Sequence, residues 1–219
     1  MALVGILGDA HGKFDVILDI IKSNPHVNRW FQVGDLGGES MEYPEFPSNF
    51  HFIQGNHENW DYLARLKEEH DPSFLVNGTL NSYNAADVSY IIGVLGGNYS
   101  PLNYNNQTTS LTGRKRRFFT VDDYDSLIYN HIRLNNRMKV DILLTHEAPT
   151  PFKKSIVDIG IPIVTDILKK IKPEIHFFGH HHIYKIIDHG ECLSVGLEYT
   201  DKSYILYNLE ERRFKKIDL

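Results

Sequence analysis

Side chains that bind divalent metal ions occur in five short clusters along the chain, and each cluster directly follows a run of apolar residues. The clusters are Gly8-Asp9-Ala10-His11-Gly12, Gly34-Asp35, Gln54-Gly55-Asn56-His57-Glu58, Thr145-His146-Glu147 and Gly179-His180-His181-His182. The candidate metal ligands in them are Asp9, His11, Asp35, Asn56, His146, His180 and His182. Oxygen ligands mixed with imidazoles suit divalent transition metals such as Mn, Fe, Zn or Ni, whereas carboxylates alone would indicate Mg or Ca.

The size of this ligand set indicates more than one metal ion. Seven ligands exceed what a single ion needs when one position stays open for substrate. They fit two ions that share one carboxylate. Two ions about 3.5–4 Å apart form the standard arrangement for in-line displacement at phosphorus, in which one ion holds a nucleophilic hydroxide and the other holds the phosphoryl oxygens. The sequence therefore predicts two divalent transition metal ions as cofactors and a phosphate ester as substrate.

The apolar runs before the clusters have the length and composition of buried strands. They are Leu3–Leu7, Trp30–Val33, Phe50–Ile53, Asp141–Leu144 and Ile175–Phe178. Amphipathic segments between them predict helices at Phe14–Ser23, Asp61–Glu69, Asp122–Asn135 and Pro162–Ile171. Alternating strands and helices predict a mostly parallel sheet, and such sheets bind ligands at the carboxyl ends of their strands. All five clusters are therefore expected to meet in one place.

The other apolar segments are shorter, often alternate with polar residues, and are separated by turn residues. They are Thr79–Tyr83, Val88–Val94, Lys185–Ile187, Cys192–Leu197 and Tyr204–Leu209. This pattern predicts mixed or antiparallel strands in a second sheet, and so an α/β fold with two sheets. No break in composition marks a domain boundary, so residues 1–219 are expected to form one domain with a polar and basic insertion at about 98–120.

The five clusters, in this order, resemble the motif series of calcineurin-like metallophosphoesterases, written GDxH, GD, GNH[ED], H and GHxH. The resemblance covers residues 8 to 182 and implies a four-layer αββα sandwich with two mixed sheets. It also implies two ligand sets: Asp9, His11, Asp35 and His182 for one metal ion, and Asp35, Asn56, His146 and His180 for the other, with Asp35 bridging. In such an enzyme a metal-bridging hydroxide would attack phosphorus. His57 would then steady the phosphoryl group or protonate the leaving oxygen, both of which an imidazole side chain can do.

The three consecutive histidines of the last cluster have different roles in this interpretation. If the segment stays extended through Ile183, alternation places His180 and His182 on one face and His181 on the other. The two flanking imidazoles can then each reach one metal ion. His181 is interpreted as a variable residue that faces away from the metals.

The second cluster departs from the pattern of protein Ser/Thr phosphatases, in which an Asp and then an Arg follow Gly-Asp. Gly38 and Glu39 occupy these positions here. Without the arginine there is no bidentate phosphate clamp, and Glu39 would repel a phosphomonoester dianion. A protein phosphatase is therefore disfavoured. His57 also lacks an orienting carboxylate, for which Glu39 and Glu58 are the candidates.

The insertion contains the run Arg114-Lys115-Arg116-Arg117, followed by two phenylalanines. Cations mixed with aromatic rings can hold a phosphodiester backbone or stack a base, although a solvated turn has the same composition. The candidate substrate contacts are Arg114, Arg116 and Arg117. The region from Gly93–Gly97 through this run loosely resembles RNA lariat debranching enzymes. We therefore expect a phosphodiesterase acting on a nucleotide or nucleic acid, with a phosphomonoesterase and a non-catalytic binding scaffold as alternatives.

The composition and the length of the apolar runs indicate the cellular location of the protein and the partners that it does not bind. A formal net charge of −5 gives no indication of a general nucleic-acid or membrane binder. The single cysteine, Cys192, excludes an intrachain disulfide and fits a reducing compartment. Asp9 comes too early for a signal peptide, and no apolar run approaches the roughly 20 residues of a spanning helix. We expect a cytoplasmic protein without a membrane partner.

Overall fold

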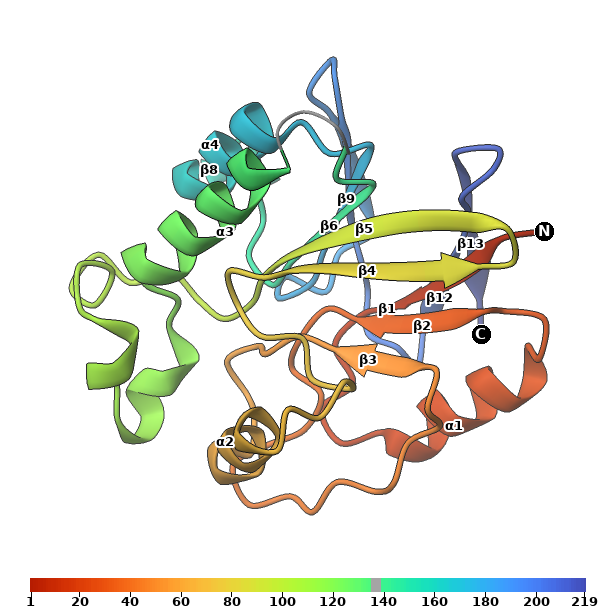
Figure 1. Cartoon of the computed structure of the whole chain (residues 1–219), viewed down its shortest axis with the longest axis horizontal. Coiled ribbons are helices and arrows are strands. Elements are labelled where there is room, and N and C mark those ends of the chain that lie inside the picture. Colours follow the sequence, from red (N-terminus) through yellow and green to blue (C-terminus); the bar gives the residue numbers. More distant parts are fainter. Residues whose placement is uncertain (135–138) are drawn as a thin grey trace.

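The strands that precede the five clusters are divided between two β-sheets (Figure 1). The computed structural model describes residues 1–134 and 139–219. The first sheet, in spatial order, contains β13 (Arg213–Asp218), β12 (Ser203–Asn208), β1 (Leu3–Leu7), β2 (Arg29–Gln32) and β3 (Phe50–Phe52). The second contains β10 (Lys185–Asp188), β11 (Leu193–Gly196), β9 (Ile175–Phe178), β6 (Ile142–Thr145), β5 (Val88–Leu95) and β4 (Leu80–Ala85).

Both sheets are mixed, as predicted, but the strands are distributed differently. β1, β2 and β3 are parallel neighbours in the first sheet, whereas β6 and β9 are parallel neighbours in the second. The prediction of one parallel sheet from the cluster strands was therefore wrong. The remaining segments did not form a sheet of their own. β12 pairs with β1 in the first sheet, and the other four, β4, β5, β10 and β11, lie in the same sheet as β6 and β9. An apolar pattern identifies a buried strand, but the choice of partner depends on contacts with distant segments.

Alternate side chains along the strands pack into different layers. In the first sheet, Phe31 lies between the two sheets, whereas its neighbour Trp30 packs against helices. In the second sheet, Leu144 lies between the sheets and its neighbour Leu143 packs against helices. The helices α1 (Phe14–Ser23) and α2 (Trp60–Glu68) cover the first sheet, and α3 (Val121–Arg133) and α4 (Pro162–Ile171) cover the second. The order helix, sheet, sheet, helix is the predicted four-layer αββα sandwich.

Polar side chains cap the N-termini of α2 and α3. α1 and α4 have the predicted bounds, whereas α2 and α3 each begin one residue earlier than predicted. Asn59 accepts a hydrogen bond from the backbone N–H of Tyr62 (3.0 Å), and Thr120 forms a capping box with Asp123. The predicted end of α3, Asn135, lies outside the described residues. In the described part of the chain, no helix is both long and apolar enough to cross a membrane.

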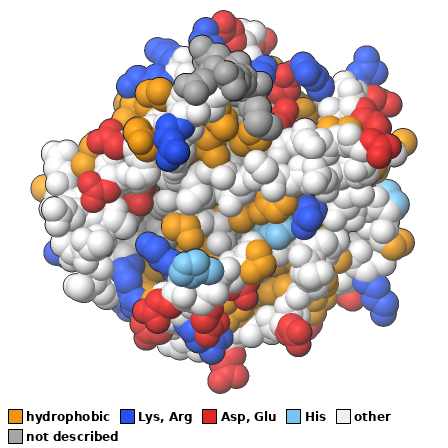
Figure 2. Space-filling view, in the orientation of Figure 1, with side chains coloured by type: hydrophobic (Ala, Val, Ile, Leu, Met, Phe, Trp, Pro, Cys, Tyr) orange, Lys and Arg blue, Asp and Glu red, His pale blue; other side chains and the backbone are white. Residues whose placement is uncertain are grey.

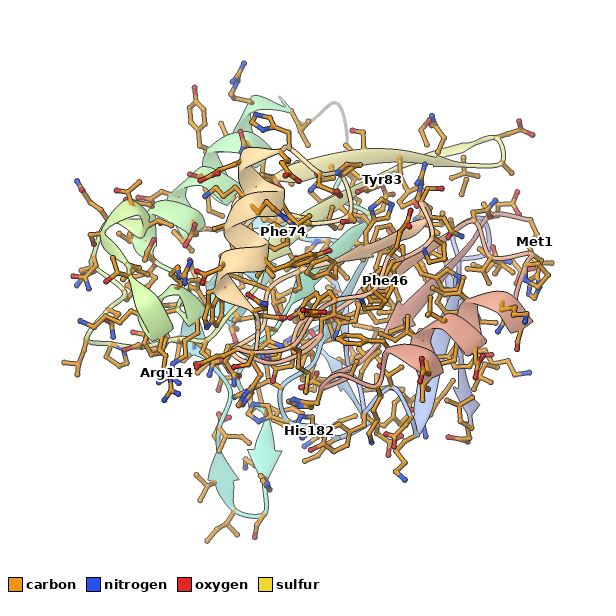
Figure 3. The ribbon with its side chains drawn as sticks, turned by 90° about the horizontal axis from the view of Figure 1, so that it is seen from below. Met1, Phe46, Phe74, Tyr83, Arg114 and His182 are labelled. Carbon is orange, nitrogen blue, oxygen red and sulfur yellow. The ribbon has the colours of Figure 1, made fainter. Side chains whose placement is uncertain are left out.

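Three features were not anticipated. The edge strand β13 is rich in charged residues, and a short hairpin is formed by β7 (Lys153–Lys154) and β8 (Val157–Asp158). In the insertion, the 3-10 helices η1 (Thr108–Ser110) and η2 (Gly113–Arg117) replace the expected loop. Figure 3 shows the β7–β8 hairpin projecting from the edge of the molecule that carries His182. These elements are too short or too polar to produce a periodic signal.

The buried His176 of β9 couples stability to pH. Its ring is fully buried between Thr145 and Ser194, with Nε2–Oγ1 and Nδ1–Oγ distances of 2.8 Å. Thr145 Oγ1 donates its hydrogen to the Glu147 carbonyl (2.6 Å), so Nε2 of His176 is the donor to Thr145. Burial lowers the pKa of His176 to about 3. The neutral ring is therefore the form that the fold accommodates.

We expect His176 to contribute to acid destabilisation. The unfolded chain binds the proton with a pKa of about 6.5 and the folded chain does so only near 3, so stability is complete above pH 6.5 and falls as the pH drops below it. At pH 5 the loss from this residue is about 2 kcal/mol. Urea unfolding of the wild type and of His176→Gln at pH 7.5 and pH 5 should show a flatter pH dependence in the variant. The exposed His26 provides the matched control, and an equal slope in wild type and His176→Gln would contradict the assignment.

Candidate metal centre

All seven candidate ligands lie where the carboxyl ends of β1, β2, β3, β6 and β9 meet. Two groups of side chains there each offer ligand atoms within 4.8 Å of one another. The first group contains Asp9, His11, Asp35 and His182, and the second contains Asp35, His146 and His180. Asp35 is common to both groups, which is the position expected of a bridging carboxylate.

The first group is closely packed. Nε2 of His182 is 2.8 Å from Oδ2 of Asp9 and 3.4 Å from Nε2 of His11. Nε2 of His11 is in turn 3.7 Å from Oδ2 of Asp35. Carboxylate oxygens and imidazole nitrogens therefore converge on one small volume, as the ligands of a divalent ion do.

Asn56 lies beside the second group. Nε2 of His146 is 3.4 Å from Oδ1 of Asp35 and 3.2 Å from Oδ1 of Asn56. Nδ1 of His146 is 2.8 Å from the Val33 carbonyl, which can only accept, so Nδ1 carries a hydrogen and Nε2 faces the group. The His180 ring lies 5.0 Å from the His146 ring, measured between centroids.

The charges of these side chains fit bound cations. Asp9 and Asp35 are almost fully buried, and in the described residues neither pairs with a lysine or arginine. Burying a carboxylate is costly unless an opposite charge compensates it. Histidines are the only ionisable side chains in the described residues that pair with them. The donor set therefore fits divalent cations.

Burial and neighbouring charges shift the pKa values of the second group in different directions. Burial alone would raise the pKa of Asp35 and lower that of His146. Their mutual attraction and hydrogen bonding outweigh burial, so the pKa of Asp35 is lowered and that of His146 is raised. Burial, together with the charge of His146, lowers the pKa of His180 to about 3. His180 thus stays neutral, which is the form that coordinates a metal, and a metal ion would displace the proton shared between Asp35 and His146.

Four of the candidate ligands have a left-handed backbone. The φ angles are 48° for His11, 56° for Asp35, 67° for His180 and 55° for His182. Such residues other than glycine are uncommon and cost roughly 1–2 kcal/mol each. The premise that the last cluster stays extended through Ile183 was therefore wrong, because β9 ends at Phe178. His180 and His182 still face the site, but through two left-handed residues rather than through alternation.

His181 does not simply face away from the site. Its ring stacks on Phe152 with a centroid distance of 4.9 Å and an interplanar angle of 18°. It also offers an atom within 4.8 Å of ligand atoms of Glu147 and His180. Glu147 is buried, accepts a hydrogen bond from the Tyr99 backbone N–H (3.0 Å), and lies 4.0 Å from Nε2 of His180. Glu147 was not among the predicted ligands, although an acidic residue next to the candidate ligand His146 was a usable signal.

The geometry around Gly179 shows why the last cluster begins with a glycine. A Cβ at this position would lie 2.3 Å from Oδ1 of Asp9. The close approach lets the backbone N–H of His180 donate to both carboxylate oxygens of Asp9 at 3.1 Å. The loop after β9 and the loop after β1 are thereby fixed against each other.

His57 lies beside the two groups but belongs to neither. Its side chain is exposed, and its ring centroid is 5.3 Å from that of His11. Its backbone N–H donates to Oδ1 of Asp35 (2.7 Å). Glu58 does not orient the ring, since its oxygens accept from the N–H groups of Leu36 and Gly55 and from the Tyr43 hydroxyl. Glu39 instead pairs with an arginine of the insertion.

That pair joins Glu39 to Arg114, with an Nε–Oε1 distance of 2.8 Å, and leaves Arg114 largely exposed. In Figure 3, Arg114 and His182 lie toward the same edge of the molecule. Arg116 is engaged elsewhere, because it donates to the Trp60 carbonyl (3.0 Å) and to Asp61 (2.8 Å). Arg117 lies over the ring of Phe118 at 4.8 Å. Arg114 is therefore the best placed of the three candidate substrate contacts.

A two-sheet sandwich that gathers aspartates and histidines at its strand ends has the architecture of a metal-dependent phosphoesterase. The chain belongs to the calcineurin-like phosphoesterase family, whose sequence model matches residues 2–184. The recognition of the family from the five clusters is thereby confirmed.

The chain is also similar to a protein of comparable length, and solved structures share its fold. An uncharacterized protein of Haemophilus influenzae strain Rd is 22% identical over 233 residues, which cover 94% of this chain and 97% of that protein. The structure of TT1561 from Thermus thermophilus is similar with a TM-score of 0.69 and 13% identity, covering 99% of this chain and 98% of that chain. A 5′-nucleotidase from Candida albicans is similar with a TM-score of 0.60 and 11% identity, covering 99% of this chain but 51% of that chain.

Proposed function

We propose that the protein is a phosphodiesterase that uses two divalent transition metal ions, such as Mn. The observation that carries the proposal is the position of Asp35 in both groups of candidate ligands. Asp9, His11, Asp35 and His182 would hold one ion, and Asp35, Asn56, His146 and His180 the other. When bound, such ions supply an activated water and neutralise charge on the phosphoryl oxygens.

The residues of the chain would position and complete this centre. The backbone N–H groups of Asn56 and His57 donate to Oδ1 of Asp35 at 2.6 and 2.7 Å, which fixes the shared carboxylate between the two groups. His57 would contact the substrate from the open side, because its ring is exposed and lies next to His11. A neutral imidazole there can steady the phosphoryl group, and an imidazolium can donate a proton to the leaving oxygen.

The preference for a diester rests on the charges at the rim of the site. Glu39 neutralises Arg114, and Asp201 pairs with Lys13. A phosphomonoester carries two negative charges near neutral pH and gains most from a free bidentate arginine, whereas a diester carries one. The paired charges suit a singly charged diester such as a nucleotide. Figure 2 shows a face that lies away from His182, and on it the basic and acidic side chains of the described residues are interspersed.

The substrate class can be tested with two matched esters. For the Mn-loaded protein we expect kcat/KM for bis-(p-nitrophenyl) phosphate to exceed that for p-nitrophenyl phosphate by at least about tenfold, a difference of about 1.4 kcal/mol in the barrier. Glu39→Gln should reduce the ratio of kcat/KM for the diester to kcat/KM for the monoester, because the substitution removes a negative charge and releases Arg114. Glu42→Gln, an exposed change in the same loop, is the control.

A phosphomonoesterase is the second candidate, favoured by the exposed guanidinium of Arg114. A faster reaction with the monoester in the wild type would establish it in place of the diesterase. A binding scaffold without catalysis is the third candidate, although none of the seven candidate ligands is missing. A cytoplasmic location is inferred from the lone Cys192 and rests on the sequence.

A further inference from the structure

Residues 198–201 lie in the segment that connects β11 to β12, which runs from the second sheet to the first and borders the first group of candidate ligands. It lies outside residues 2–184, the part of the chain that matches the family model. None of the five clusters includes it. Its contacts nevertheless concentrate on the first group.

Tyr199 touches both histidines of that group. Its ring stacks on His182 with a centroid distance of 3.8 Å and an interplanar angle of 19°. It also meets the His11 ring edge-on, at 5.7 Å and 60°. In the described residues, none of its aromatic contacts is with His146 or His180. The ring therefore contacts one group of ligands and not the other.

The neighbours of Tyr199 hold it firmly in this place. The backbone N–H of Thr200 donates to the Asp9 carbonyl (2.9 Å), and its hydroxyl donates to the Gly8 carbonyl (2.7 Å). A Cβ on Gly8 would lie 1.8 Å from the Glu198 carbonyl oxygen, so the first cluster needs its glycine to accommodate this segment. Lys13 lies over the Tyr199 ring at 5.7 Å and pairs with Asp201.

His11 and His182 need such support because both have left-handed backbones, with φ angles of 48° and 55°. A residue in this region is held there by its surroundings. An imidazole whose orientation is fixed before the metal arrives binds it more tightly, and residues that orient metal ligands are worth about 10–100-fold in affinity. The stacked ring of Tyr199 restricts His182 most, since it covers one face of the imidazole.

We propose that Tyr199 is a positioning residue that orients His182 and His11 for one of the two metal ions. The inference rests on the proposed two-metal function and adds a residue to it. It predicts an asymmetric effect, in which one ion is weakened and the other is not.

The proposal is tested by measuring the affinity of the protein for metal ions, which does not depend on catalytic turnover. Isothermal titration of metal-free protein with Mn²⁺ should give two sites in the wild type. In Tyr199→Ala one site should weaken by about 10–100-fold while the other keeps its Kd within about twofold. Tyr199→Phe retains the ring and should bind both ions like the wild type. Tyr129→Ala, at an exposed tyrosine of α3, is the matched control.

Tyr199→Leu keeps apolar volume without a planar face, so it reports on the stacking even if the alanine variant fails to fold. Unchanged affinities in Tyr199→Ala or Tyr199→Leu, or an equal weakening of both sites, would overturn the positioning role. So would a Phe variant as weak as the Ala variant, because the hydroxyl would then be the active part. Fewer than two sites in the wild type would instead overturn the two-metal function itself, whereas two sites without ester cleavage would leave the role of Tyr199 intact.

Discussion

Asp35→Asn is expected to leave the protein folded, to lower its metal content below two ions, and to reduce kcat/KM for a diester by more than about a hundredfold. Asp35 supplies an atom to both groups of candidate ligands, so the loss of its charge weakens both. Residues that only hydrogen-bond to metal ligands are worth about 10–100-fold, and the shared ligand should be worth more. An asparagine can keep Oδ1 as the acceptor for the N–H groups of Asn56 and His57, which preserves the loops.

The measurement is elemental analysis of metal-saturated protein, alongside kinetics on bis-(p-nitrophenyl) phosphate. Asp87→Asn, in the exposed turn between β4 and β5, is the matched control and should bind two equivalents like the wild type. Two tightly bound equivalents in Asp35→Asn would refute the bridging role. Fewer than two in the wild type would favour the scaffold over the enzyme.

His57→Ala is expected to retain both metal ions and to lose about 100-fold or more in kcat. General acid catalysis contributes about 10²–10⁴-fold, and the His57 side chain belongs to neither candidate group. The alanine keeps the backbone N–H that donates to Asp35, so the shared carboxylate should not move. The loss should grow with the basicity of the leaving group, because an alkoxide needs a proton more than p-nitrophenolate does.

Comparison of a p-nitrophenyl diester with an alkyl or nucleoside diester separates the two roles assigned to His57. A loss that is equal for both leaving groups would indicate that His57 steadies the phosphoryl group rather than donating a proton. Full activity of His57→Ala with both diesters would exclude both roles. Loss of a metal ion in this variant would indicate that His57 is a metal ligand. The exposed His26 serves as the control through His26→Ala.

The fold was predictable where local pattern determines structure. Buried strands of four or five apolar residues and amphipathic helices such as α1 and α4 were located from periodicity alone. The convergence of the clusters within each sheet followed from a general property of parallel strands, which present their carboxyl ends at one edge. That both sheets present these ends to the same site did not follow from it. The distribution of the strands between two sheets did not follow, because pairing is decided by contacts such as that of β12 with β1, about 200 positions apart.

The residues that support the site were hidden for a similar reason. No sequence motif around Tyr199 identifies it, since its contacts with His11 and His182 form only when the segment after β11 folds against the first and last clusters. Glu58 was noticed as part of a cluster, but its bonds to Leu36, Gly55 and Tyr43 require the folded loops. The left-handed ligands were also unpredictable, because such conformations are unfavourable locally and persist only when the surrounding structure compensates.

The distribution of the clusters over two sheets has a consequence for folding. Asp9, His11, Asp35 and Asn56 follow strands of the first sheet, whereas His146, His180 and His182 follow strands of the second. On the proposed assignment, each metal ion therefore joins the two halves of the sandwich, in addition to the apolar core between them. Separation of the sheets would require release of both ions, so metal concentration would set part of the folding free energy, about 2.7 kcal/mol for each independent site at a hundredfold excess over Kd. Catalytic competence and the cohesion of the two sheets would then be governed by the same binding equilibria.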